Sequence, residues 1–558
     1  MAVALATLAY GLLLRLWILA HVPLFGDEAV AGLMARRIGA GHFSVFYWGQ
    51  DYGGVEPYVT ALLFRLGGSG PTSLNMTPAV LAALAAGLVA AIVRAAGGRR
   101  PLALAAGAAA WVFPYTVLWN SVREVGFRYA TLCCGLAAVL CAVRIQHGRA
   151  GLGAFAALGL ALGVGWWAAP EIVYFVPPCL VLLLRWWLRG GGAEEGEPER
   201  VPAGRLAKAS AVAGAGFLFG SIPWWYANIG SGFASLRVPA TLGNGPIGYD
   251  GRLSVLLHYM LPMQLGLRVV PGGAWVGGPH LGHLLYASAL ALVGACLMRA
   301  VWLVRHDAGA LTPLALGAGV VAFPFIYAAV PASAYWIDGR YGLYLPFLVV
   351  PLVALSSAWQ GARRREALPE PGSADPPPRR SLLRRPAPSA ERRRVATLVQ
   401  AGVGMLGVTV LTLGGAHAAG IPTSPGAFFS GWGDPNAPMQ RTVDDLVAHH
   451  IGFAYGDYWT AYDLEFIGQG RVAVSPTKMD VERWPSLLAQ VRASRDPAWL
   501  FFAPGRDAGA VFSNPQPGPG PYTEATFETF LKGQGIAYRV VPLGVLDAVI
   551  PAHRVMIP

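Results

Sequence analysis

Residues 2–29 read AVALATLAYGLLLRLWILAHVPLFGDEA: an apolar run long enough to span a membrane, followed by the adjacent carboxylates Asp27 and Glu28. A helix needs about 20 predominantly apolar residues to cross a bilayer. The run lacks the basic first region of a secretory signal peptide, and Arg15 interrupts it, so we expect a retained helix. The chain therefore opens with a membrane helix that brings two acidic side chains to a membrane surface.

Similar apolar segments recur along the first three quarters of the 558 residues. The chain is 54% hydrophobic and 13% charged, whereas soluble domains carry about 25% charged residues. We predict about eleven transmembrane helices in a domain formed by residues 1–419. These helices are expected at residues 2–20, 74–95, 102–119, 129–143, 150–167, 172–188, 209–226, 284–304, 311–330, 341–357 and 396–418.

Arginine and lysine gather in alternate connections between these segments, from residues 94–100 to the Pro- and Arg-rich linker 359–395. The positive-inside rule places such connections in the cytoplasm. With a cytoplasmic N-terminus, an odd number of helices puts residues 420–558 outside, together with loops 21–73 and 228–283. The linker cannot bury apolar surface, so it is expected to be a solvated topology anchor, with contact to anionic lipid as the alternative.

The net charge of +12 does not indicate a nucleic-acid partner, because the basic residues follow this topological pattern and form no groove-lining face. All five cysteines lie inside apolar segments, where thiols behave as small hydrophobic groups. We therefore expect neither a disulfide framework nor a zinc site.

Outside the apolar segments, two kinds of structure are expected. In loop 21–73, residues 29–38 and 58–66 are too short to span a membrane and are predicted to be helices lying in the membrane interface. Residues 420–558 alternate helix and strand signals, which predicts a small extracytoplasmic α/β domain around a mostly parallel sheet. Its helices are expected at 443–450, 460–467, 484–493 and 523–533, and its strands at 451–455, 471–474, 498–502, 538–542 and 546–550. The predicted fold class is a polytopic α-helical membrane protein with a C-terminal α/β domain.

Asp27 and Glu28 stand where the first helix leaves the membrane. Ionisable groups at a membrane boundary that face a protein cavity are candidates for function. Alternatively, Asp27 caps the helix that follows, since an N-cap Asp accepts free amide hydrogens and suits the helix dipole. The two interpretations are compatible, so both residues remain candidates.

Three further polar groups fall on the same side of the membrane under this topology. The first loop interleaves aromatic and polar residues, a pattern that suits a sugar ring and also an interfacial aromatic belt: Tyr47, Trp48, Gln50, Asp51, Tyr52 and Glu56. The connections before the fourth and tenth helices hold Asn120, Arg123, Glu124 and Arg128, and Tyr335, Trp336, Asp338, Arg340 and Tyr341. Carboxylates beside arginines suit a reaction in which a base activates a hydroxyl while cations hold a phosphate leaving group.

A first loop that opens with Asp27-Glu28, after a helix that carries Arg15, resembles the GT-C glycosyltransferase superfamily. Within it, the chain is most similar to bacterial members of the protein-mannosyltransferase-like group, glycosyltransferase family 39. Residues 338–346, DGRYGLYLP, are similar to the Arg-Tyr-Leu-Leu-Pro signature of that group, and Ile-Pro-Trp-Trp at 222–225 also fits. Many relatives have His-Pro or Lys-Pro where this chain has Glu-Pro at 56–57. Because of this difference, the resemblance does not identify the acceptor.

The resemblance implies an enzyme of the bacterial inner membrane that transfers a hexosyl or pentosyl group, with inversion, from a polyprenyl-phosphate sugar. The acceptor would be a glycan, lipid or protein of the cell envelope. Asp27 would be the catalytic base with Glu28 beside it, and Arg340, with Arg123 or Arg128, would hold the donor phosphate. Substrate-binding roles would fall to Tyr47, Trp48, Gln50, Asp51, Tyr52, Glu56, Glu124, Asp338 and Tyr341. No metal or other cofactor is expected.

Two other functions were weighed against this one. A transporter or lipid-carrier flippase usually shows internal repeats and polar residues near mid-membrane, whereas here the ionisable residues cluster at helix ends. A receptor with a ligand-binding C-terminal domain would give the loop around Asp27 no role. For the C-terminal domain itself, acceptor binding and a purely structural cap remain open.

Overall fold

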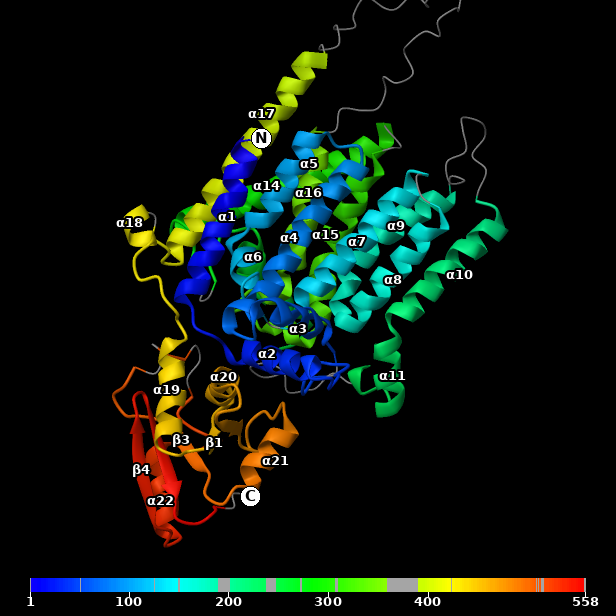
Figure 1. Cartoon of the computed structure of the whole chain (residues 1–558). Helices are drawn as coiled ribbons and strands as arrows, with labels where there is room; N and C mark the ends of the chain where they lie inside the picture. Colours follow the sequence, from blue (N-terminus) through cyan, green and yellow to red (C-terminus); the bar gives the residue numbers. More distant parts are fainter. Residues whose placement is uncertain are drawn as a thin grey trace, which may run out of the picture.

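The computed structural model describes residues 2–50, 52–124, 126–148, 151–188, 201–236, 247–270, 273–306, 310–358, 390–422, 424–507, 509, 511–512 and 516–555. A large helical bundle and a small α/β domain are packed end to end (Figure 1). Most of the predicted linker 359–395 lies outside the described residues; from 390 onward it belongs to the last bundle helix.

Helices occupy all eleven segments predicted to cross the membrane. Their bounds are α1 (Ala2–His21), α4 (Pro71–Ala95), α5 (Arg100–Val112), α7 (Arg128–Gln146), α8 (Leu152–Ala168), α9 (Val176–Leu188), α10 (Ala203–Gly220), α14 (Pro279–His306), α15 (Leu311–Ala329), α16 (Tyr344–Ala358) and α17 (Ala390–Ala418). By length and apolarity, six of the described helices could cross a membrane, or seven if α10 and the bent α11 (Ile222–Ser231) form one span.

The predicted helix 102–119 is interrupted, because Pro114 supplies no backbone N–H to continue it. Helix α5 ends before Phe113, and a short α6 (Tyr115–Asn120) follows. The remaining short helices are η1 (Pro170–Phe175), η2 (Ala234–Leu236), α12 (Tyr249–Val255), η3 (Leu256–Met260), α13 (Leu261–Gln264), η4 (Pro331–Ala334), η5 (Arg340–Gly342) and α18 (Pro425–Phe428).

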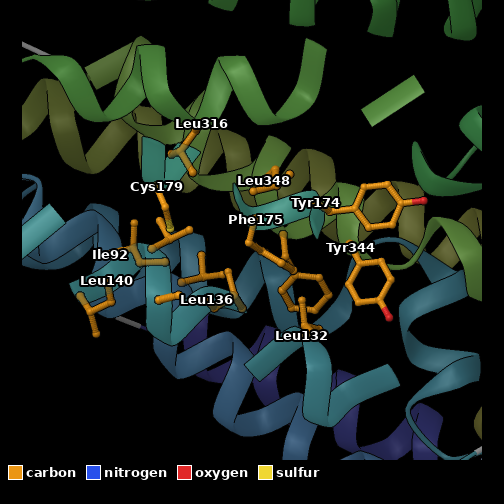
Figure 2. Packing of buried hydrophobic residues seen from close by; sticks show 14 of the residues in the cluster. Ile92, Leu132, Leu136, Leu140, Tyr174, Phe175, Cys179, Leu316, Tyr344 and Leu348 are labelled. Atoms are coloured by element: carbon orange, nitrogen blue, oxygen red, sulfur yellow. The ribbon is translucent and has the colours of Figure 1, made fainter. Parts of the chain in front are cut away.

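The core of the bundle is made of aliphatic and aromatic side chains from α4, α7, α9, α15 and α16. Figure 2 shows Leu136, Phe175 and Leu348 within this cluster, together with Cys179, which packs there as a small hydrophobic group. The ring centroids of Tyr174 and Tyr344 lie 5.3 Å apart. By contrast, many large apolar side chains of α1, α14 and α17 are exposed on the outside of the bundle. That distribution is expected where lipid, not water, surrounds the helices.

Two helices of the first loop lie across the end of the bundle that faces the α/β domain: α2 (Gly26–Gly39) and α3 (Val55–Gly67) (Figure 1). Helix α3 leaves Leu62 and Leu66 58% and 79% exposed, as an interfacial helix would. The interfacial prediction is wrong for α2, because most of its residues are buried between the bundle and the α/β domain.

The C-terminal domain contains a five-stranded sheet in the order β2-β1-β3-β5-β4. Its strands are β1 (Phe453–Gly456), β2 (Ala473–Pro476), β3 (Ala498–Phe502), β4 (Tyr538–Leu543) and β5 (Leu546–Pro551). Its helices are α19 (Ala437–Ala448), α20 (Tyr458–Gly468), α21 (Pro485–Ala493) and α22 (Glu524–Gly533). Strand β1 pairs in parallel with β2 and β3, but β5 is antiparallel to both β3 and β4. The prediction of a mostly parallel sheet is therefore wrong for its second half, where a two-residue loop with Gly544 at φ 72 makes a hairpin.

The domain is docked onto α2 through α20, and the two helices share one hydrophobic core. A side chain at Gly32 would meet the Phe466 ring at 2.3 Å, and one at Gly26 would meet Trp459 at 2.9 Å, so glycine permits this close approach. Arg36 Nη1 also donates to the carbonyl of Phe466 at 2.7 Å. The contact between Gly26 and Trp459 places the N-terminus of α20 beside the N-terminus of α2.

Candidate active site

A cavity of about 280 Å³ lies where the bundle, the first loop and the C-terminal domain meet. Its lining combines one carboxylate, three guanidinium groups and several aromatic rings. The lining residues are Asp27, Tyr47, Gln50, Tyr52, Phe127, Arg128, Arg340, Tyr341, Tyr458, Trp459, Val481 and Arg483.

Asp27 lies in the first turn of α2, and its side chain is 18% exposed, toward the cavity. Oδ2 lies 3.4 Å from Arg340 Nη1, and Oδ1 accepts a hydrogen bond of 2.8 Å from the Tyr458 hydroxyl. The N-cap of α2 is Phe25, and no side chain caps the helix. The capping interpretation of Asp27 is therefore wrong, although the helix dipole still favours a negative charge there.

Glu28 is fully buried and does not line the cavity. Its carboxylate forms an ion pair with Arg123 Nε and accepts a 3.2 Å hydrogen bond from Asn75 Nδ2. Burial outweighs the attraction of Arg123 and raises the pKa of Glu28 to about 7. Glu28 and Arg123 thus form a structural pair beneath the site.

Arg340 enters the cavity from η5. Its Nε lies 3.1 Å from Asp338 Oδ2, and its backbone N–H donates to Asp338 Oδ1 at 3.0 Å. The rings of Tyr335 and Tyr341 flank the guanidinium, with centroids 4.9 and 5.7 Å from Cζ. Asp338 thus orients Arg340, which leaves Nη1 directed at Asp27.

Arg128 is the first residue of α7 and is only 3% exposed. Its guanidinium stacks on Phe127 and Tyr341, with 4.4 and 4.7 Å between Cζ and the ring centroids. Within the described part of the chain, no carboxylate forms an ion pair with it. Glu56 and Glu171 attract it only from beyond ion-pair distance. A buried cation without a direct counter-ion is costly, so this position suits an anionic ligand.

Only some of the other predicted site residues line the cavity. Tyr47, Gln50, Tyr52 and Tyr341 line the cavity. Glu56 and Glu124 are buried outside it, where they accept hydrogen bonds from the backbone N–H groups of Ala130 and Gly126. Burial raises the pKa of both carboxyls. Trp48 packs against Trp484 instead of the cavity, with ring centroids 5.1 Å apart, and Asp51 lies outside the described residues.

Four cavity residues come from the C-terminal domain, for which acceptor binding was one of the two open roles, but none is among the predicted site residues: Tyr458, Trp459, Val481 and Arg483. A signal for them was present. Tyr458 and Arg483 lie in the segments that follow β1 and β2, two adjacent parallel strands. The carboxyl ends of such strands are the usual place for binding sites in α/β domains.

The fold is shared with a protein of known structure. No family model matches the chain, and no curated protein matches it by sequence. ArnT from Cupriavidus metallidurans bound to undecaprenyl phosphate superposes with a TM-score of 0.56 at 13% identity, covering 98% of this chain and 97% of that one. The apo state of ArnT gives a TM-score of 0.57 at the same identity and coverage.

The chain shares the ArnT fold and is a polytopic α-helical membrane protein with a C-terminal α/β domain, the fold class predicted from the sequence. Membership in the GT-C superfamily is an expectation from the sequence. Membership in the protein-mannosyltransferase-like group remains a prediction from the sequence. Among the described residues, no cluster of three or more His, Cys, Asp or Glu side chains could hold a metal ion.

Proposed function

We propose that this protein is a membrane glycosyltransferase that transfers a hexosyl or pentosyl group from a polyprenyl-phosphate donor to an acceptor of the cell envelope. One observation carries the proposal. A single cavity holds a partly exposed carboxylate, Asp27, 3.4 Å from Arg340, and a buried guanidinium, Arg128, that forms no ion pair with a carboxylate among the described residues.

These groups match the charge changes of glycosyl transfer. Asp27 takes the proton of the acceptor hydroxyl while the hydroxyl oxygen attacks the anomeric carbon of the sugar. The bond from that carbon to the phosphate oxygen breaks, the carbon inverts, and polyprenyl phosphate leaves. Arg128 and Arg340 stabilise the negative charge that develops on the phosphate. The groups for acceptor activation and for leaving-group stabilisation thus line the same cavity.

A second cavity supports a lipid-linked donor. It encloses about 400 Å³ between α5, α14, α16 and α17 and is lined almost entirely by apolar side chains. Its lining includes Leu265, whose neighbour Gln264 donates to the carbonyl of Gly339 at 2.7 Å. An isoprenoid chain lying in this cavity would therefore end close to Arg340.

We further propose that the bundle lies in a bacterial inner membrane, with the N-terminus in the cytoplasm and the C-terminal domain outside. A reporter enzyme fused after residue 558 is expected to be active outside the cytoplasm, and one inserted near residue 377 is expected to be active inside. Activity on the other side at either position contradicts the proposed topology.

The proposed reaction is tested with purified protein in liposomes that contain polyprenyl-phosphate sugars labelled in the sugar, with and without a crude cell-envelope fraction. We expect label to leave the donor and to appear in the acceptor fraction only when the protein is present. The main alternative, a lipid-carrier flippase, predicts that labelled lipid crosses the bilayer while the sugar stays attached. Translocation without transfer would therefore replace the proposed function.

A further inference from the structure

The C-terminal domain contributes two polar side chains to the cavity, Tyr458 and Arg483, which the reaction described above does not use. Among the described residues, Arg483 is the one charged side chain that this domain contributes to the cavity lining. Tyr458 and Arg483 both contact groups outside their own domain. These contacts connect the docked domain to Asp27 and to the first loop.

Tyr458 is held rigidly at the start of α20. The preceding residue, Asp457, is the N-cap of that helix and accepts hydrogen bonds from the backbone N–H groups of Trp459 at 3.0 Å and Thr460 at 3.3 Å. Tyr458 is 8% exposed, and its hydroxyl donates to Asp27 Oδ1 at 2.8 Å. Burial and the nearby Asp27 raise the pKa of the Tyr458 hydroxyl well above 10, so it remains a donor at neutral pH.

Arg483 ties Tyr458 to the first loop. Its Nη1 donates to the carbonyls of Gly49 at 2.7 Å and Trp48 at 3.3 Å, and its Nε donates to the Tyr458 hydroxyl at 3.4 Å. The Gln50 side-chain amide, oriented to match both neighbours, accepts hydrogen bonds from Arg483 through its oxygen and donates one to the Tyr52 hydroxyl through its nitrogen, each at 3.0 Å. A single guanidinium therefore connects the C-terminal domain, the first loop and the partner of Asp27.

The two oxygens of Asp27 are thus fixed from opposite sides. Arg340 of the bundle lies beside Oδ2, and Tyr458 of the C-terminal domain donates to Oδ1. An ionised carboxylate has about four lone-pair sites, so two such contacts leave room for an acceptor hydroxyl. Without Tyr458 the carboxylate could rotate about its Cβ–Cγ bond, and the alignment needed for proton transfer would be lost part of the time.

We propose that Tyr458 and Arg483 are positioning residues of the active site: Tyr458 fixes the Asp27 carboxylate, and Arg483 fixes the Tyr458 hydroxyl and the first loop. The C-terminal domain is then part of the catalytic apparatus and not only a cap. The inference rests on the proposed role of Asp27 as the base.

The test compares Tyr458→Phe and Arg483→Lys with Tyr538→Phe and Arg471→Lys, two substitutions of the same types elsewhere in the domain. For each full-length variant in liposomes, kcat, the acceptor KM, the donor Kd and the melting temperature are measured. We expect Tyr458→Phe to lower kcat about 10- to 100-fold. Donor Kd and melting temperature are expected to stay at wild-type values. Arg483→Lys is expected to lower kcat by a smaller factor, and the two control variants are expected to behave like the wild type.

Wild-type kcat in Tyr458→Phe overturns the inference while leaving the proposed function intact, provided that the wild type transfers sugar. A loss of activity that only follows a loss of folded protein, in both Tyr458→Phe and Arg483→Lys, assigns them a structural role and also overturns it. If the wild type transfers no sugar from any donor tested, both the proposed function and this inference are contradicted.

Discussion

Asp27 and Glu28 are adjacent in the sequence and carry the same acidic group, but the fold separates their environments. Asp27 is 18% exposed in a cavity beside Arg340 and Tyr458. Glu28 is fully buried against Arg123 and Asn75. Successive residues of an α-helix point about 100° apart, so α2 directs one carboxylate into the cavity and the other into the protein.

The difference shows which feature separates a reactive carboxylate from a structural one. Both acids have an arginine partner, so ion pairing alone does not identify the base. Only Asp27 retains exposed surface toward a space that could hold a substrate, and only its arginine partner also lines that space. Each prediction below tests one side of this comparison.

The largest effect is expected from the two isosteric amide substitutions. Asp27→Asn keeps the size of the side chain but cannot take a proton at neutral pH, so kcat is expected to fall about 100- to 10,000-fold with normal donor binding. Glu28→Gln is expected to keep kcat close to the wild-type value, because Glu28 does not reach the cavity. Steady-state transfer assays on both variants measure the contrast. Equal losses in the two variants, or full transfer by Asp27→Asn, would remove the distinction between these residues.

The arginine partners are expected to differ next. Arg340→Ala removes a charge-assisted contact to the donor phosphate and is expected to weaken donor binding about 30- to 1,000-fold. Arg123→Ala is expected to lower the melting temperature, because it leaves Glu28 buried without its cation, and to leave the donor Kd of the folded protein unchanged. Titration with a polyprenyl-phosphate sugar gives both values. An unchanged donor Kd in Arg340→Ala would make this arginine a structural partner of Asp338.

A smaller effect concerns pH and stability. The pKa of Glu28 is about 7 in the folded protein and about 4.3 for an unperturbed Glu. The folded state therefore binds more protons between these values, so the contribution of Glu28 to stability falls as pH rises from about 4 to about 7 and is constant above that. Glu28→Gln is expected to flatten part of this decline, measured as melting temperature at pH 5 and pH 8. The remaining decline in stability is expected to come from Asp457 and Glu465, because burial also raises their pKa values to about 7.

The smallest effect is expected at a third carboxylate–arginine pair, Asp444 and Arg471, on the surface of the C-terminal domain. The two side chains are 53% and 43% exposed and lie 2.7 Å apart. Exposed pairs of this kind contribute at most about 1 kcal/mol, because water and salt screen them. Arg471→Ala is expected to leave transfer at the wild-type rate and stability almost unchanged. A large loss of either would show that burial is the wrong criterion for ranking the three pairs.

The sequence predicted where the bundle helices lie, because long apolar runs favour helices in a membrane protein. Of the eleven predicted spans, six or seven are described helices long and apolar enough to cross a membrane. The sequence also predicted the strands at residues 538–542 and 546–550, but not that they form an antiparallel hairpin. The two-residue loop containing Gly544 was a usable signal for that pairing. Pro114 separates α5 from α6, whereas Pro78, Pro324 and Pro351 lie inside continuous helices, so the proline alone did not predict this break.

The site was harder to predict, because its geometry depends on long-range packing. Arg340 and Asp27 are far apart in sequence, and they were grouped only through the predicted topology and the family resemblance. Nothing local distinguishes Glu28 from Asp27, since the direction of each side chain follows from how α2 packs against α20 and α4. Tyr458 and Arg483 required the docking of the C-terminal domain, which no local pattern specifies.

The most direct test of the central claim is an experimental structure of the protein with a bound polyprenyl-phosphate sugar, or with polyprenyl phosphate alone. We predict that the phosphate lies within hydrogen-bond distance of the guanidinium groups of Arg128 and Arg340. The lipid chain should extend into the apolar cavity between α5, α14, α16 and α17. A phosphate bound elsewhere, with the cavity beside Asp27 left empty, would contradict the proposed active site.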